Sequence, residues 1–227
     1  MLLQIPDVLT PEQAAHCLRL LEAADWVDGR GTAGHLSHGV KDNQQLRFDN
    51  PVSVELGEMI TRRLETNPLF MSAALPHKIV PPLFNRYAGL QRYGDHVDGA
   101  IRPIDGTPHR VRTDLSATLF LSDPADYDGG ELVIEEPIGA RRVRLPAGHL
   151  LLYPSSSIHR IEPVTRGVRL ASFFWVQSLV RDDADRSVLF ELDCTLRTLP
   201  RDTDQEKRAL LSLTNVYHNL VRRWADA

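Results

Sequence analysis

The 227-residue sequence contains only two cysteines, Cys17 and Cys194. Two cysteines this far apart do not form a disulfide framework, and there is no C-x-x-C motif that would indicate a zinc or redox site. Cys17 falls on the apolar stripe of an expected helix, so we expect a small buried side chain there. The low cysteine content favours the reducing environment of the cytoplasm.

The sequence also lacks a basic block, a signal peptide and a long hydrophobic run. The formal net charge is −4, and the densest basic stretch, residues 141–144, is better explained as an exposed strand face. Pro6 and Asp7 interrupt the N-terminal apolar stretch, and no basic region precedes it. No apolar run reaches the length of a membrane span. We therefore expect neither a nucleic-acid partner nor a membrane partner.

Short β-prone segments dominate the middle of the chain. Runs rich in β-branched or aromatic residues cover 79–87, 111–121, 131–135, 141–145, 149–153, 158–164 and 168–176. Turn signals such as 128–130 (Asp-Gly-Gly) separate them, and this spacing predicts a β-sandwich or barrel. Helical patterns flank the block and do not alternate with its strands, so a parallel α/β fold is not expected.

Helices are expected before the strand block. Thr10 as N-cap, Pro11 at the first helical position and Gln13 closing a capping box predict a helix that runs to about residue 24. A second helix is expected from Pro51 and should end before Pro68. Residues 28–50 between them are polar and glycine-bearing, which predicts a long loop with a functional role.

A helical hairpin is expected after the strand block. The helical period returns after Arg181 and stops at Pro200, and residues 203–206 form a second capping box. The last helix carries an apolar seam at spacings of three and four: Leu210, Leu213, Tyr217, Leu220 and Trp224. Either packing on the barrel or a homodimer contact would bury this seam. We expect a domain over residues 1–180 and a C-terminal helical extension over 181–227.

Three side chains are candidate metal ligands. Residues two apart in a strand share a face, so His96 and Asp98 can point into the same barrel mouth. His159 begins another expected strand. Two imidazoles and one carboxylate suit Fe(II) with open positions for substrate and oxygen, whereas a structural zinc site would be closed. The alternatives are solvated loop residues for the first pair and a semi-buried core histidine for His159.

Arg169 is a candidate binder of a carboxylate. It lies between Val168 and Leu170 in a run, 168–176, that has no other charge. A guanidinium buried without a partner is costly, so this strand needs a carboxylate from elsewhere. A bound ligand gripped by both arms of the guanidinium would provide it. A buried salt bridge to Asp114 or Glu131 is the alternative.

Several segments together resemble the bacterial PKHD-type hydroxylases, in the prolyl-4-hydroxylase-like branch of the Fe(II)/2-oxoglutarate dioxygenases. They are 85–87 (Asn-Arg-Tyr), 93–98 (Tyr-Gly-Asp-His-Val-Asp), 128–132 (Asp-Gly-Gly-Glu-Leu), the pair His159 and Arg169, Thr32-Ala33-Gly34 with Val40-Lys41, and the helical tail. The resemblance implies a mainly β fold with flanking α-helices: a double-stranded β-helix (jelly-roll, cupin-like) core, N-terminal helices and a C-terminal helical hairpin. It also implies Fe(II), 2-oxoglutarate and L-ascorbate as cofactors.

The resemblance assigns roles by position. His96, Asp98 and His159 would hold the metal, and Arg169 would bind 2-oxoglutarate. Some related enzymes have Ser or Thr two residues after the basic anchor, where this chain has Ala171. Tyr87 and Tyr93 are the candidates for the missing second contact.

The implied reaction is hydroxylation of a small molecule or peptide by molecular oxygen, with release of succinate and CO2 and a link to iron acquisition. Arg30, Lys41 and Asn43 in the polar loop are expected either at a substrate rim or in solvent. Phe173, Phe174 and Trp175 are expected in the core. A non-catalytic sensor that binds metal and 2-oxoglutarate, and a cupin-like sugar-binding barrel, are the alternative functions.

Overall fold

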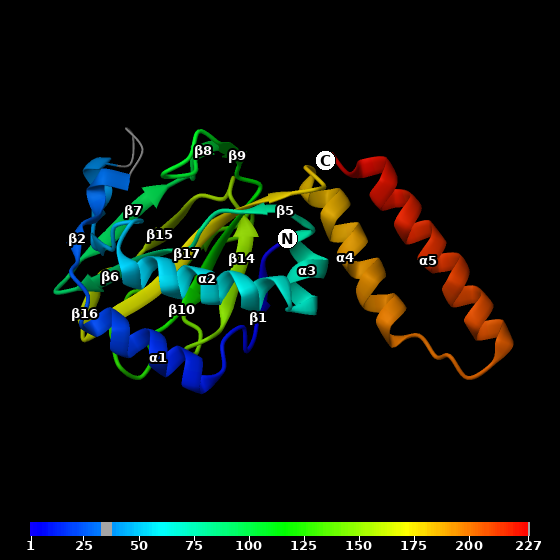
Figure 1. The fold of residues 1–227 in the computed structure, drawn as a ribbon, viewed down its shortest axis with the longest axis horizontal. Coiled ribbons are helices and arrows are strands. Elements are labelled where there is room, and N and C mark those ends of the chain that lie inside the picture. Colours follow the sequence, from blue (N-terminus) through cyan, green and yellow to red (C-terminus); the bar gives the residue numbers. More distant parts are fainter. Residues whose placement is uncertain (33–37, 227) are drawn as a thin grey trace.

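The computed structural model describes residues 1–32 and 38–226. Ala33 and Gly34 of the resemblance motif lie outside the described residues. Two antiparallel sheets form the body of the molecule, helices cover one of them, and a helical hairpin projects from one end (Figure 1).

The larger sheet has eight strands. Its order is β1 (Leu3–Ile5), β14 (Leu150–Pro154), β10 (Leu115–Phe120), β17 (Val168–Ser178), β6 (Leu83–Ala88), β4 (Gln44–Gln45) and β2 (Val27–Asp28), with β5 (Pro76–Ile79) also paired to β17. The long strand β17 lies at its centre, so one face of β17 looks toward the second sheet and the other toward the helices.

The smaller sheet has five strands, in the order β13 (Ala140–Val143), β12 (Leu132–Glu135), β15 (His159–Ile161), β7 (Arg92–His96) and β3 (Lys41–Asp42). Two hairpin-like pairs complete the β-structure: β8 (Ile101–Pro103) with β9 (Arg110–Arg112), and β11 (Asp128–Gly129) with β16 (Val164–Arg166). The expectation of a mainly β core between flanking helices is confirmed.

Three N-terminal helices, α1 (Pro11–Glu22), α2 (Pro51–Glu65) and α3 (Pro68–Ala74), pack on the outer face of the larger sheet (Figure 1). The predicted capping box of α1 is confirmed, because the Thr10 side chain accepts from the Gln13 amide and the Gln13 side chain accepts from the Thr10 amide. The apolar core beneath these helices includes Leu21, Leu56 and Phe174. A second apolar cluster, with Tyr87 and Tyr153 among its members, fills the space between the sheets.

One predicted strand was wrong, and prolines explain why. The expected strand 79–87 is broken at Pro81 and Pro82 into β5 and β6, because proline cannot donate to a sheet. The predicted end of the second helix before Pro68 is confirmed, and Pro68 then begins α3, a helix that was not predicted and that Asn67 caps. The expected loop 28–50 contains two 3-10 turns, Gly29–Thr32 and His38–Val40, and adds β3 and β4 to the two sheets.

The C-terminal hairpin consists of α4 (Asp183–Thr198) and α5 (Asp204–Trp224). Helix α4 packs against α3, and α5 lies along α4, away from the sheets (Figure 1). Packing of the last helix on the barrel is therefore wrong: no residue of α5 is buried, and most of its predicted seam is half-buried beside α4. None of the described helices is long and apolar enough to span a membrane.

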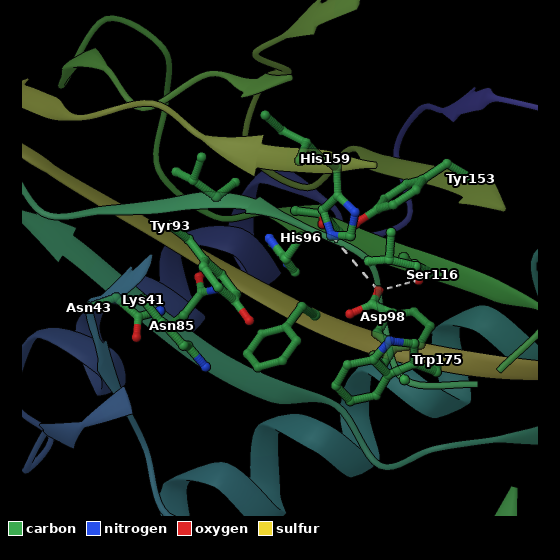
Figure 2. Close-up of a pocket in the computed structure, with 18 of the residues that line it drawn as sticks. Lys41, Asn43, Asn85, Tyr93, His96, Asp98, Ser116, Tyr153, His159 and Trp175 are labelled. Atoms are coloured by element: carbon green, nitrogen blue, oxygen red, sulfur yellow. Dashed lines mark hydrogen bonds and ion pairs between the residues drawn. The ribbon is translucent and has the colours of Figure 1, made fainter. Parts of the chain in front are cut away.

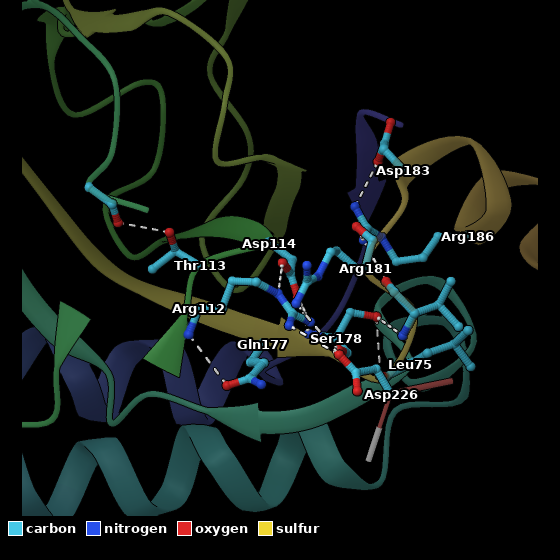
Figure 3. A network of polar contacts seen from close by, with 12 residues as sticks. Leu75, Arg112, Thr113, Asp114, Gln177, Ser178, Arg181, Asp183, Arg186 and Asp226 are labelled. Carbon is cyan, nitrogen blue, oxygen red and sulfur yellow. Dashed lines mark hydrogen bonds and ion pairs between the residues drawn. The ribbon is translucent and has the colours of Figure 1, made fainter. Parts of the chain in front are cut away.

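The end of the hairpin returns to the β-core. The amide of Asp226 donates to the carbonyl of Leu179 at 2.7 Å. The Asp226 carboxylate lies 3.7 Å from the guanidinium of Arg112, which also pairs with Asp114 at 2.7 Å (Figure 3). These contacts fix the base of the hairpin to the strand pair β8–β9 and to the end of β17.

Candidate metal centre

Two neighbouring strands and one following turn bring the three predicted ligands together. His96 ends β7 and His159 begins β15, and the two are direct partners in the antiparallel register. Asp98 lies just beyond the end of β7 rather than within a strand. One donor atom from each of the three residues lies within 4.8 Å of the others (Figure 2). The structure thus assembles a cluster of two imidazoles and one carboxylate.

Backbone carbonyls orient both imidazoles. Nδ1 of His96 lies 2.8 Å from the carbonyl oxygen of Gly94, and Nδ1 of His159 lies 3.0 Å from that of Ser157. A carbonyl can only accept, so each Nδ1 carries the proton and donates it. The Nε2 lone pairs are therefore free to bind a metal. A hydrogen bond from the other ring nitrogen is the usual second contact of a metal-binding histidine.

Two serines orient the carboxylate. The Ser116 hydroxyl, on β10, donates to Oδ2 of Asp98 at 2.6 Å and lies 2.8 Å from the Ser155 hydroxyl. Nε2 of His159 lies 3.8 Å from the same Asp98 oxygen. No pattern in the sequence marked either serine, since only the fold brings residue 116 beside residues 98 and 155.

Aromatic rings cover the imidazoles. The Tyr93 ring stacks on His96 with centroids 3.6 Å apart, and the Tyr153 ring meets His159 edge-on at 5.2 Å. Burial, and then the neighbouring His159, lower the pKa of His96 to about 4. His96 is therefore neutral at physiological pH, which is the form that ligates a metal.

Arg169 is buried between the sheets and has no protein partner. Its side chain is 1% exposed, and in the described part of the chain none of its three guanidinium nitrogens has a hydrogen-bond partner. The rings of Tyr87 and Phe120 lie 5.5 and 5.3 Å from its guanidinium carbon. The alternative of a buried salt bridge is wrong, because Asp114 pairs with Arg112 instead. A buried cation without a partner fits a site for an anionic ligand.

A cavity of about 280 Å³ contains the three candidate ligands. Tyr87, the register partner of Arg169, and Tyr93, over His96, both line it. Of the predicted rim residues, Lys41 and Asn43 line the cavity, and the amide of Asn43 is buried without a hydrogen-bond partner among the described residues.

Of the two expectations for Arg30, the solvated position is the one observed. Arg30 does not line the cavity: it is exposed, and its Nε donates to Asp28 at 2.9 Å. Phe173, Phe174 and Trp175 were expected in the core, but they line the cavity as well. Arg102 on β8 also lines it, and no feature of the sequence marked it.

The comparisons with known proteins agree on one family. Residues 82–177 match the family model of the 2OG-Fe(II) oxygenase superfamily, and residues 183–226 match that of the PKHD-type hydroxylase C-terminal domain. A PKHD-type hydroxylase of Bordetella pertussis is 57% identical over 226 residues, with both chains covered completely.

Solved structures share the fold. A prolyl-4-hydroxylase from Pseudomonas putida superposes with a TM-score of 0.52 at 21% identity, over 78% of this chain and 92% of that one. HygX from Streptomyces hygroscopicus, solved with nickel, 2-oxoglutarate and hygromycin B bound, gives 0.53 at 15% identity, over 79% and 84%. The predicted jelly-roll core is thereby confirmed. With more than half of its residues identical over its full length to a named member, this chain belongs to the PKHD-type hydroxylases, enzymes of the 2OG-Fe(II) oxygenase superfamily.

Proposed function

We propose that this chain hydroxylates a small molecule or peptide with molecular oxygen, using Fe(II) held by His96, Asp98 and His159. We further propose that Arg169 binds the distal carboxylate of 2-oxoglutarate. The observation that carries this proposal is the guanidinium of Arg169, which is buried without a partner in the described residues, between the sheets that hold the candidate ligands. When bound, iron and 2-oxoglutarate supply the oxidative chemistry, with release of succinate and CO2.

The residues present fit both groups. Two imidazoles and a carboxylate whose donor atoms lie within 4.8 Å of one another match a facial triad, which leaves coordination positions open. A planar guanidinium suits a carboxylate, which accepts two parallel hydrogen bonds from it. Tyr87 lies beside Arg169, whereas Tyr93 lies over His96, so Tyr87 is the better candidate for the second carboxylate contact.

The protein's own contribution is positioning and exclusion of water. The carbonyls of Gly94 and Ser157 and the hydroxyl of Ser116 hold the ligands in one geometry before any metal arrives. Burial raises the pKa of Tyr87, so its hydroxyl stays protonated and can donate to a carboxylate. The rings of Tyr93 and Tyr153 limit the access of solvent to the metal ligands.

Anaerobic titration with Fe(II) and 2-oxoglutarate tests the binding proposal. We expect a weak visible charge-transfer band when both are bound. The band should be lost in Asp98→Ala, weakened at a given 2-oxoglutarate concentration in Arg169→Ala, and retained in Arg166→Ala. Arg166 is the matched control because it is exposed and pairs with Asp128 at 2.6 Å. Absence of the band in the unmodified protein, with zinc bound tightly in four-coordinate form, would contradict the proposal.

Turnover separates the hydroxylase from a non-catalytic sensor. We expect succinate release from 2-oxoglutarate in air, slow without substrate and faster with the metabolite extract that contains it. Ascorbate is part of this proposal through the family resemblance, and it should prolong turnover. A product heavier by one oxygen in untargeted mass spectrometry of that extract would identify the substrate. Binding of both groups without succinate under any of these conditions would favour the sensor.

Three further parts of the proposal rest on the sequence and the resemblance. Residues 1–180 are proposed as the catalytic domain and 181–227 as an extension that mediates a homodimer. Exposed apolar side chains on α5, with Leu211 at 69%, support a contact there, which light scattering of the protein and of Leu211→Lys would test. A cytoplasmic location and a link to iron acquisition would be tested by fractionating cells and by growing a deletion strain under chelation.

A further inference from the structure

We infer that the substrate of this enzyme is an anion, and that Lys41 and Arg102, which line the metal cavity, bind its negative group. This inference rests on the proposed function and adds the chemical class of the substrate to it.

The charges of the proposed cofactors cancel without Lys41 and Arg102. A ferrous ion and Arg169 contribute positive charge, and Asp98 and the 2-oxoglutarate dianion contribute an equal negative charge. The lining includes no carboxylate other than that of Asp98 among the described residues. Lys41 and Arg102 add two further cations to this lining, and the other carboxylates that act on them, Asp28 on Lys41 and Asp105 on Arg102, lie outside it. An anionic substrate would balance them.

Lys41 and the candidate metal ligand His96 both contact the ring of Tyr93. The Lys41 side chain is 5% exposed, and its ammonium lies 3.2 Å from Oε1 of Gln45 and 5.2 Å from the centre of the Tyr93 ring. The same ring stacks on His96 at 3.6 Å. A group bound by Lys41 is therefore close to the metal but separated from it by an aromatic side chain.

Arg102 is positioned in the same cavity by contacts with Trp175. Its guanidinium lies 3.9 Å from the centre of the Trp175 ring, and Trp175 is the register partner of Ser116, which bonds to Asp98. No hydrogen bond or ion pair of this guanidinium is found within the described residues. Stacking on a ring fixes the plane of a guanidinium and leaves its edge N–H groups able to bind a carboxylate or phosphate.

Arg102 and Trp175 also line a second cavity. Its volume is about 510 Å³, and it lies between α2 and the β8–β9 pair, with Pro81, Pro82 and Val80 in its wall. This space can hold the part of the substrate beyond its charged group. Burial and the charge of Arg102 lower the pKa of Lys41 to about 7, and an anion bound beside Lys41 would favour its charged form.

Matched anionic and neutral probes test the inference. The protein is loaded anaerobically with Fe(II) and 2-oxoglutarate until the charge-transfer band is complete, and N-acetyl-L-glutamate or the neutral N-acetyl-L-glutamine amide is then titrated by calorimetry. We expect the unmodified protein to bind the anion more tightly by about tenfold. Lys41→Met combined with Arg102→Met should reduce this preference to within about twofold while leaving the band intact. Arg110→Met, an exposed arginine on β9, should keep the full preference.

The outcomes are separable. No band means that the proposed function fails before any probe is added. A complete band with equal or undetectable binding of the two probes overturns the anionic assignment and leaves the proposed function standing. If the double variant still binds the anionic probe more tightly, other residues recognise the charge, which overturns the roles of Lys41 and Arg102.

Discussion

Polar side chains between the sheets differ from those of the C-terminal hairpin in their burial and in their pairing. Between the sheets, Arg169, Asn43 and Asn85 carry buried polar atoms with no hydrogen-bond partner among the described residues. On the hairpin, most polar side chains are exposed and many are paired, as Arg197 is with Asp193 at 2.7 Å, while the buried Arg186 donates to the carbonyls of Val180 and Arg181. Because a buried unpaired group is costly and an exposed pair contributes little, unsatisfied polarity marks where a ligand belongs.

The largest expected effect is the loss of a metal ligand. His96→Ala or Asp98→Ala should abolish binding of Fe(II) and reduce succinate release to background, since two remaining donors do not make a facial triad. Metal content after anaerobic loading measures this, with His77→Ala, an exposed histidine on β5, as control. Full iron occupancy in either ligand variant would contradict the assignment of these residues as metal ligands.

Removal of the buried guanidinium comes next. Arg169→Ala should weaken 2-oxoglutarate binding by about 2–5 kcal/mol, the range for truncating one partner of a buried charge pair. Iron binding should be retained. Anaerobic titration of the charge-transfer band gives both quantities, and unchanged 2-oxoglutarate affinity would favour a sugar-binding barrel over the proposed site.

A smaller loss is expected from the serine behind the carboxylate. Ser116→Ala removes the donor to Asp98 and should lower iron affinity by about 10-fold to 100-fold, as for other outer contacts of metal ligands. Competition with a chelator would measure this. Ser212→Ala, an exposed serine on α5, should change nothing, in line with the contrast between the two regions.

The smallest effect concerns pH. The pKa of Lys41 is lowered to about 7, so its positive charge is present below that value and lost as the pH rises through it. Affinity for N-acetyl-L-glutamate should therefore fall between about pH 6 and about pH 8, and Lys41→Arg should flatten the profile because arginine stays charged. The charged and titratable groups around Lys41 are Arg102, Asp98, Asp28, Tyr93 and His96. A pH profile that is the same for Lys41→Arg and the unmodified protein would assign the effect to one of those neighbours.

Local patterns in the sequence predicted more than distant pairings did. The capping boxes and the spacing of His96 and Asp98 are short-range signals, and the structure shows the predicted capping of α1 and α5 and the approach of the two side chains. Arg102 was missed because its place in the cavity depends on the β8–β9 pair and on stacking with Trp175, over seventy positions away in the sequence.

Other cavity-lining residues lie on β17, a strand that is buried on both faces. Residues 169–172 are all buried, so no alternation of polar and apolar residues shows which side chains face the cavity. Trp175 was expected in the core as a large aromatic residue, and it is buried but also lines the cavity. The polar loop left Arg30 open between a substrate rim and solvent, and its neighbour Asp28 holds it at the surface.

A crystal structure of the protein with Mn(II) in place of Fe(II) and with 2-oxoglutarate would show both proposed sites at once. We expect the metal on His96, Asp98 and His159, and the distal carboxylate of 2-oxoglutarate within about 2.7–2.9 Å of the Arg169 guanidinium nitrogens. A metal bound elsewhere, or Arg169 paired with a protein carboxylate while 2-oxoglutarate occupies another place, would contradict this expectation.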